Sequence, residues 1–207
     1  WHNVLENNLN KEQENTEVIN LGEPATGIEE HADKYISYGH KYEPDILIIA
    51  LNARDYTDYK EFEKYEKRKY NKDNDTNLNQ EDYLDRHHKK LWKDYRDEQV
   101  SRSQSYKLAR FRKHLERINQ SLSGKEEIHI LLHSNSHFGL KQFLEGYSEK
   151  NNWNFIDWRN FYEEEAAEEE VVISDKDPHF NKYGNRLWAE KLQERISFHD
   201  TDKESQK

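Results

Sequence analysis

Asp177 and His179 lie two residues apart near the C-terminal end of the chain, just ahead of a segment with a helical pattern. A carboxylate close to a histidine can fix the tautomer of the imidazole ring and stabilise its protonated form, which suits the histidine to act as a general base. The intervening Pro178 also fits a plain turn that carries a histidine on the surface. Taken alone, the spacing favours the turn, so the catalytic interpretation depends on the rest of the chain.

Asn52 directly follows the apolar run 46–51, whose short length and β-branched residues are typical of a buried parallel strand. An asparagine at the end of such a strand can donate its side-chain amide to an oxyanion. It can equally serve as a cap or turn residue, and the position alone favours that second role.

A turn with glycine and proline, residues 22–27, follows the short apolar run 17–21. We expect the run to form a strand and the turn to lead into a helix, whose first backbone N–H groups stabilise negative charge. Such turns are common in strand–helix units, so the feature is weak by itself.

The elements that must position these residues follow from the apolar and polar patterns. The patterns predict strands at 17–21, 45–51, 127–132 and 153–156, and helices at 1–10, 28–42, 103–120, 140–150 and 181–196. Strands that alternate with helices predict an α/β domain with a parallel sheet, in which 17–21 and 45–51 pair through a right-handed crossover. In such a sheet the chemistry lies at the carboxyl ends of the strands.

The pattern predicts a single domain over residues 1–198, followed by a polar tail over 199–207. Residues 55–102 are dominated by Tyr, Lys, Glu and Asp, and we interpret them as a charged helical insertion at the C-terminal edge of the sheet. The acidic stretch 163–170 is typical of a solvated helix or loop, because consecutive carboxylates do not converge on one cation.

Together these segments resemble the SGNH/GDSL family of esterases and acyltransferases, in the family's order and over nearly the whole chain. Residues 17–27 are similar to its second block, a hydrophobic strand ending in Asn-x-Gly and followed by Pro and small residues. Residues 44–55 are similar to its third block, Pro-Asp, an aliphatic strand and Gly-x-Asn-Asp. The most specific match is 177–190, similar to the fifth block, where Asp and His precede Asn, Gly and a helix with Arg-Leu-x-Ala-Glu. The resemblance implies a three-layer, flavodoxin-like α/β fold.

The resemblance also implies roles for four residues. His179 would be the general base, and Asp177 would orient it. Asn52 would donate its side-chain amide to the oxyanion of the tetrahedral intermediate. The family's second oxyanion donor is the backbone N–H of a glycine, and this position falls on Ala25. Because the donor is a main-chain N–H, alanine can take the place of glycine wherever its backbone conformation is allowed for alanine.

The family's first block, Gly-Asp-Ser at the end of an inner strand, has no counterpart in the 207 residues. Residues 1–10 resemble the helix that follows that serine, so we expect the nucleophile and the first strand of the sheet on an upstream segment. The resemblance therefore predicts a serine-dependent ester hydrolase or O-acyltransferase, present here as a fragment that is inactive alone. The Tyr-rich, charged composition of 55–102 favours a polar ester, such as a carbohydrate ester, as the substrate. The alternative is a non-catalytic SGNH-like binding or scaffolding module, for example one that binds glycans. It is favoured by the absent serine and by Ala50 and Ala53, which replace the Gly and Asp of the third block.

Composition narrows the partners and cofactors. A net charge of −10 argues against nucleic acid, since phosphate binding needs a basic surface. The absence of cysteine excludes disulfides and thiolate metal sites, and no apolar run approaches the roughly 18 residues that a membrane span needs. His133 and His137 lie in an expected strand-to-helix loop, which disfavours a zinc pair. We therefore expect neither a metal nor an organic cofactor, and a small-molecule or glycan ester as the substrate.

Overall fold

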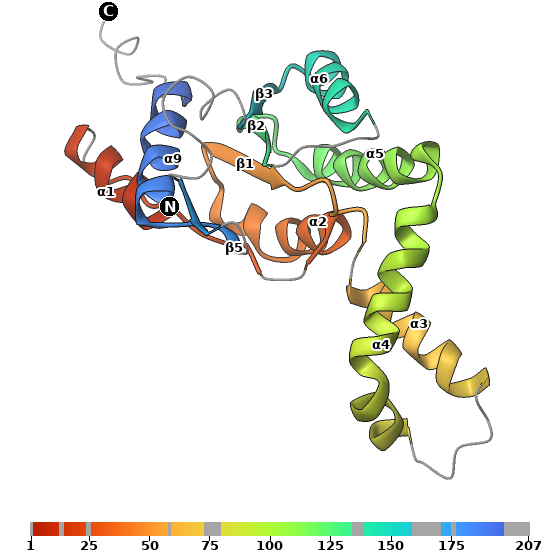
Figure 1. Cartoon of the computed structure of the whole chain (residues 1–207). Coiled ribbons are helices and arrows are strands. Elements are labelled where there is room, and N and C mark those ends of the chain that lie inside the picture. Colours follow the sequence, from red (N-terminus) through yellow and green to blue (C-terminus); the bar gives the residue numbers. More distant parts are fainter. Residues whose placement is uncertain are drawn as a thin grey trace, which may run out of the picture. The chain divides into compact units, whose positions relative to one another are not determined.

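The structure is a computed structural model, shown in Figure 1. It describes residues 2–12, 15–23, 26–57, 59–72, 80–133, 139–158, 171–174 and 177–196. The chain falls into two compact units, one of Trp1–Asn20 with Trp158–Lys207 and the other of Leu21–Asp157. The expectation of one domain over 1–198 stays a prediction.

The unit Leu21–Asp157 is built on a parallel sheet of three described strands. These strands are β1 (Ile46–Leu51), β2 (Glu127–Leu132) and β3 (Asn154–Asp157), in the order β1-β2-β3. Leu51 lies opposite Leu132, and Leu132 lies opposite Asp157, so the carboxyl ends of all three strands are level at one edge. The strands expected at 45–51, 127–132 and 153–156 are confirmed to within one residue.

Three helices pack on one face of this sheet: α2 (Ile28–Ser37), α5 (Gln104–Ser121) and α6 (Leu140–Asn151). A short 3-10 helix, η1 (Gly39–Tyr42), follows α2. Ile28, Phe111 and Leu144 from the helices are fully buried in one core with Ile130 of β2. This arrangement confirms the α/β class with a parallel sheet, because each helix buries an apolar stripe against the strands.

The expected helical insertion is also present, and it has a core of its own. It consists of α3 (Tyr59–Lys72) and α4 (Gln80–Ser101), which pack against each other (Figure 1). Its hydrophobic core consists of the buried residues Phe62, Tyr65, Tyr83, Leu91 and Tyr95. The ring of Phe62 lies 4.6 Å from that of Trp92 and 5.5 Å from that of Tyr95, within the range of favourable aromatic pairs. Aromatic packing therefore holds this hairpin together despite its charged surface.

The second unit contains α1 (His2–Glu12), α9 (Lys182–Arg195) and an antiparallel pair of strands, β4 (Val172–Ser174) and β5 (Asp177–Phe180). Helices α1 and α9 pack on each other, which buries Leu5 and Leu192. The ring of Trp158 lies 5.1 Å from the rings of both Phe180 and Trp188. The helices expected at 1–10 and 181–196 are confirmed, whereas the β4–β5 pair was not expected.

The strand expected at 17–21 is wrong, and so is its crossover pairing with 45–51. The structure gives this segment no strand hydrogen bonds. Its Val18 N–H instead donates to Glu6 Oε2 of α1 at 2.9 Å, and Ile19 is exposed. An apolar run becomes a strand only where a neighbouring strand supplies its ladder of hydrogen bonds, and sequence pattern does not report that neighbour. Of the helices described, none is both long enough and apolar enough to cross a bilayer.

Candidate functional site

Asn52 occupies an exposed turn at the carboxyl end of β1, and hydrogen bonds hold it there. Its side-chain Oδ1 accepts the N–H of Arg54 at 3.1 Å. Its backbone N–H donates to Asp55 Oδ2 at 2.7 Å, and its C=O accepts the N–H of Asp55 at 3.0 Å. The turn role anticipated for this residue is therefore present. The turn also orients the side-chain amide of Asn52. Because the amide group is planar and its oxygen points toward the Arg54 N–H, its nitrogen points away from Arg54.

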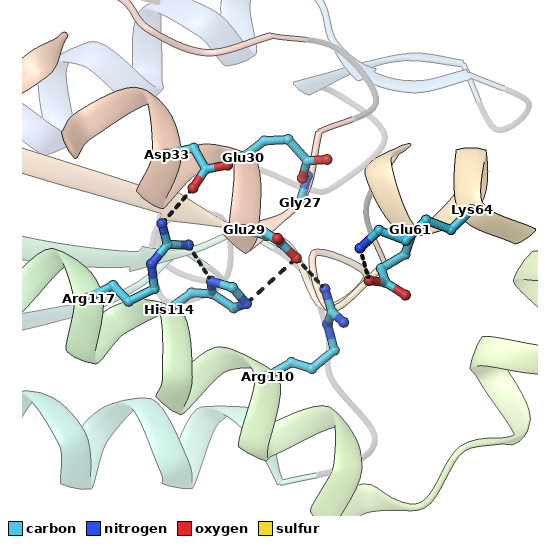
Figure 2. Close-up of polar contacts among 9 residues, drawn as sticks. All are labelled: Gly27, Glu29, Glu30, Asp33, Glu61, Lys64, Arg110, His114 and Arg117. Carbon is cyan, nitrogen blue, oxygen red and sulfur yellow. Dashed lines mark hydrogen bonds and ion pairs between the residues drawn. The ribbon is translucent and has the colours of Figure 1, made fainter. Parts of the chain in front are cut away.

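Asp55 titrates close to neutral pH in this turn. Burial raises the pKa of the half-buried Asp55 carboxyl to about 7; the hydrogen bond from Asn52 opposes the rise and the negative charge of Glu30 adds to it. Glu30 is itself buried and accepts the N–H of Gly27 at 3.0 Å (Figure 2). Two carboxyl groups thus flank the end of β1, and a carboxyl with a raised pKa is a frequent feature of functional sites.

Gly27 brings a second segment into direct contact with this turn. A Cβ atom at Gly27 would lie only 2.2 Å from the backbone oxygen of Thr57 and 2.8 Å from that of Asp55. The adjacent Ile28 N–H donates to the Asp55 oxygen at 2.8 Å. The loop before α2 and the turn after β1 are therefore bonded to each other, although Ile28 and Asp55 are 27 positions apart in the chain. Ala25, the expected second oxyanion donor, lies outside the described residues.

The other two strands end in polar residues at the same edge. His133, the first residue after β2, is half-buried, and its N–H donates to the Leu51 oxygen at 2.8 Å. At the end of β3, the buried Asp157 forms an ion pair with Lys141 Nζ at 3.0 Å. His137 lies outside the described residues. Within the part of the chain that is described, there is no cluster of three or more His, Cys, Asp or Glu side chains that could hold a metal ion.

The segment that carries the strongest resemblance has a tightly fixed backbone. Asn181 caps α9 by accepting the Gly184 N–H at its Oδ1 at 2.9 Å. A Cβ atom at Gly184 would lie 2.3 Å from the backbone oxygen of Val171, so only glycine fits. Asp177 and His179 belong to β5, two residues or more before this cap, and their side chains lie outside the described part. The structure thus accounts for the Asn and Gly of the motif by packing, and leaves the expected roles of Asp177 and His179 as predictions.

A partly buried ion network between α2 and α5, drawn in Figure 2, was not expected from the sequence. Arg110 Nη2 lies 3.1 Å from Glu29 Oε2, and Arg117 Nη2 lies 2.6 Å from Asp33 Oδ1. Arg117 Nη1 also donates to Nδ1 of the buried His114 at 3.1 Å. No local sequence pattern could reveal this network, because its partners lie far apart in the chain. Glu29 and Arg110, for example, are 81 positions apart.

His114 is uncharged at neutral pH within this network. Burial lowers the pKa of His114 to about 4; Glu29 opposes this shift, and the nearby Lys113, Arg110 and Arg117 add to it. Since Arg117 can only donate, Nδ1 of His114 accepts, and the neutral ring carries its proton on Nε2, 3.9 Å from Glu29 Oε2. The network therefore braces α2, the helix whose first turn contacts the Asn52 turn.

No protein-family model, curated protein or solved structure matches this chain. The SGNH/GDSL resemblance accordingly stays a prediction, and any functional conclusion rests on the residues and the geometry above.

Proposed function

We propose that this chain is the larger part of an SGNH/GDSL-type serine esterase or O-acyltransferase, with a three-layer, flavodoxin-like fold, that acts on a polar ester such as an acylated carbohydrate. The Asn52 turn carries the proposal: an exposed amide at the carboxyl end of a parallel strand, with its oxygen engaged by Arg54. An oxyanion donor is effective when it is oriented before the charge develops. The contact of Gly27 with the same turn supports the proposal, because the second donor is expected two residues before it.

The proposed reaction proceeds through an acyl-serine. The serine Oγ attacks the ester carbonyl carbon while His179 takes the hydroxyl proton, and Asp177 stabilises the resulting imidazolium. The oxyanion accepts hydrogen bonds from the Asn52 amide and the Ala25 backbone N–H. His179 then protonates the departing alkoxide. Water or a sugar hydroxyl next gives its proton to His179 and attacks the acyl carbon; the bond from that carbon to serine Oγ breaks, and His179 returns the proton to the serine. The serine comes from a segment outside these 207 residues, and the reaction requires neither metal nor organic cofactor.

The test is ester hydrolysis by the protein produced with its natural upstream coding sequence. We expect turnover of short-chain aryl acetates, a fall in kcat of about 10⁴-fold or more for His179→Ala, and a fall of roughly 10²- to 10³-fold for Asn52→Ala. Matched controls are His40→Ala, in the 3-10 helix, and Asn154→Ala, at the opposite end of the sheet; both residues are exposed, and both variants should keep full activity.

Two results would contradict the proposal. One is full activity of the His179→Ala variant, and the other is an upstream coding sequence without Gly-Asp-Ser. The second result would favour the non-catalytic glycan-binding module. Residues 1–207 alone should show no turnover, so serine-dependent hydrolysis by that chain would refute the assignment of the nucleophile to another segment.

A further inference from the structure

Asp55 holds the turn after β1 through both its carboxylate and its backbone. Its carboxylate Oδ2 accepts the N–H of Asn52 at 2.7 Å, and its own N–H returns a bond to the Asn52 oxygen at 3.0 Å. Its C=O accepts the N–H of Ile28 at 2.8 Å. One residue therefore closes the turn and fastens it to the first turn of α2.

The hydrogen bonds of Asp55 restrict the side chain of Asn52 as well as its backbone. The bond from the Arg54 N–H to Asn52 Oδ1 lies within the same 52–55 turn. Asp55 is the sole carboxylate among residues 52–57, and charge-assisted bonds to backbone N–H groups are about twice as strong as neutral ones. If the carboxylate of Asp55 is lost, the turn loses its strongest bond and the amide of Asn52 is released to rotate.

We propose that Asp55 is the positioning residue of this site: its carboxylate fixes the 52–55 turn, which directs the amide nitrogen of Asn52 away from the turn and toward the substrate oxyanion. The catalytic part of this inference rests on the function proposed above, whereas the effect on the turn does not. Glu30 of α2 accepts the N–H of Gly27 (Figure 2), and its negative charge acts on Asp55. The two carboxyl groups therefore hold the two segments that meet here.

Nuclear magnetic resonance of the 15N-labelled 207-residue chain tests the turn without any assay of activity. In the unaltered chain, we expect the Asn52 backbone N–H shift to titrate with a midpoint near the pKa of Asp55, which burial raises to about 7. Asp55→Ala should speed hydrogen exchange at the Asn52 N–H roughly tenfold, and leave Ile130 in the core unchanged. Asp55→Asn keeps an oxygen acceptor, so it should restore much of the protection but abolish the titration.

The matched control is Asp45→Ala, which makes the same change at an exposed residue just before the other end of β1 and should leave the Asn52 exchange rate unchanged. Unaltered exchange at Asn52 in Asp55→Ala would overturn the inference. So would acceleration at Ile130 by the same factor as at Asn52, because Asp55 would then act only on global stability.

Kinetics of the serine-bearing protein then test the catalytic part. Asp55→Ala should lower kcat by about the same factor as Asn52→Ala with KM unchanged, and the double variant should be no worse than Asn52→Ala, because both changes remove one donor. Unchanged kcat in Asp55→Ala would overturn the positioning role. An absence of ester turnover in the unaltered protein would contradict the proposed function instead, and the exchange measurement would then decide the role of Asp55 in the turn.

Discussion

Gly27 and Gly184 each face a backbone oxygen at a distance that no side chain tolerates. The ideal Cβ positions lie 2.2 Å from the Thr57 oxygen and 2.3 Å from the Val171 oxygen. Because both obstructing atoms belong to the main chain, neither can rotate aside as a flexible side chain would. The two glycines lie in the two blocks that suggested the family, so part of what makes these blocks distinctive is close backbone packing.

Gly27→Ala should lower the free energy of unfolding by roughly 1–3 kcal/mol, because the new methyl group forces the 55–57 segment to move. Urea denaturation followed by circular dichroism measures this change. The matched control is Gly146→Ala on α6, where the added Cβ meets no atom within 4 Å, and helix propensity predicts a gain of up to roughly 1 kcal/mol. An unchanged urea midpoint for Gly27→Ala would mean that the two loops are not packed at this distance.

The elements that sequence pattern predicted well are those that carry their own signal. Strands β1 and β2 are apolar runs bounded by polar residues, and α2, α5, α6 and α9 each show helical periodicity. The strand expected at 17–21 failed because its apolar run needs a partner that the pattern does not contain. The β4–β5 pair was missed because β4 has only three residues and β5 contains Pro178, which ordinarily argues against a strand.

The candidate site also contains residues that the sequence could predict and residues that it could not. Asn52 could be predicted as an oxyanion donor or turn residue because it directly follows an apolar strand, and the structure adds the hydrogen bonds that orient it. The part played by Asp55 depends on burial and on the approach of Gly27, which arise only when distant segments meet. Arg110 and His114 meet Glu29 for the same reason, so their contacts could not be inferred from local spacing.

The α3–α4 hairpin has an aromatic core separate from that of the sheet, so it should open without unfolding the sheet. Phe62→Ala removes a fully buried ring from that core and should cost about 3–5 kcal/mol locally. Hydrogen exchange should then accelerate throughout α3 and α4 while the N–H of Ile130 in β2 stays protected. Glu63→Ala, at an exposed position of the same helix, is the control and should change neither. Equal acceleration in the hairpin and in β2 would show that the two cores unfold together.

At the scale of the whole molecule, buried titratable groups set how stability changes with pH. Burial lowers the pKa of both His31 and His114 to about 4, with Lys34 adding to the shift of His31. Between their ordinary value of 6.5 and about 4, both rings are charged in the unfolded chain and neutral in the folded one. Unfolding then takes up protons, so acid destabilises the fold. Burial shifts the pKa of His129 in the same direction.

Asp55 acts in the opposite sense. Its pKa is raised from 3.8 to about 7, so between these values it is protonated in the folded chain and ionised in the unfolded one. This difference stabilises the fold as pH falls from about 7 toward 4. Near pH 5.5 the two or more histidines together take up more protons on unfolding than Asp55 releases. The net uptake on unfolding is therefore about one proton or more. The free energy of unfolding should fall by about 1.4 kcal/mol or more for each pH unit of acidification in this range.

Two substitutions should change that slope in opposite directions. His114→Gln removes one proton uptake and should flatten the slope by about 1.4 kcal/mol per pH unit, whereas Asp55→Asn removes the opposing group and should steepen it by about the same amount. Urea unfolding at intervals between pH 6.5 and 5 measures the slope, because this range lies above the value of 4.5 from which the pKa of Glu126 is lowered to about 2. Asn154→Ala, at an exposed position, is the control: it changes no titratable group and should leave the slope unchanged. If the plots of unfolding free energy against pH were parallel for the His114→Gln variant and the unaltered chain, His114 would ionise as readily in the folded protein as in the unfolded one. That result would contradict a neutral, buried His114 in the α2–α5 network.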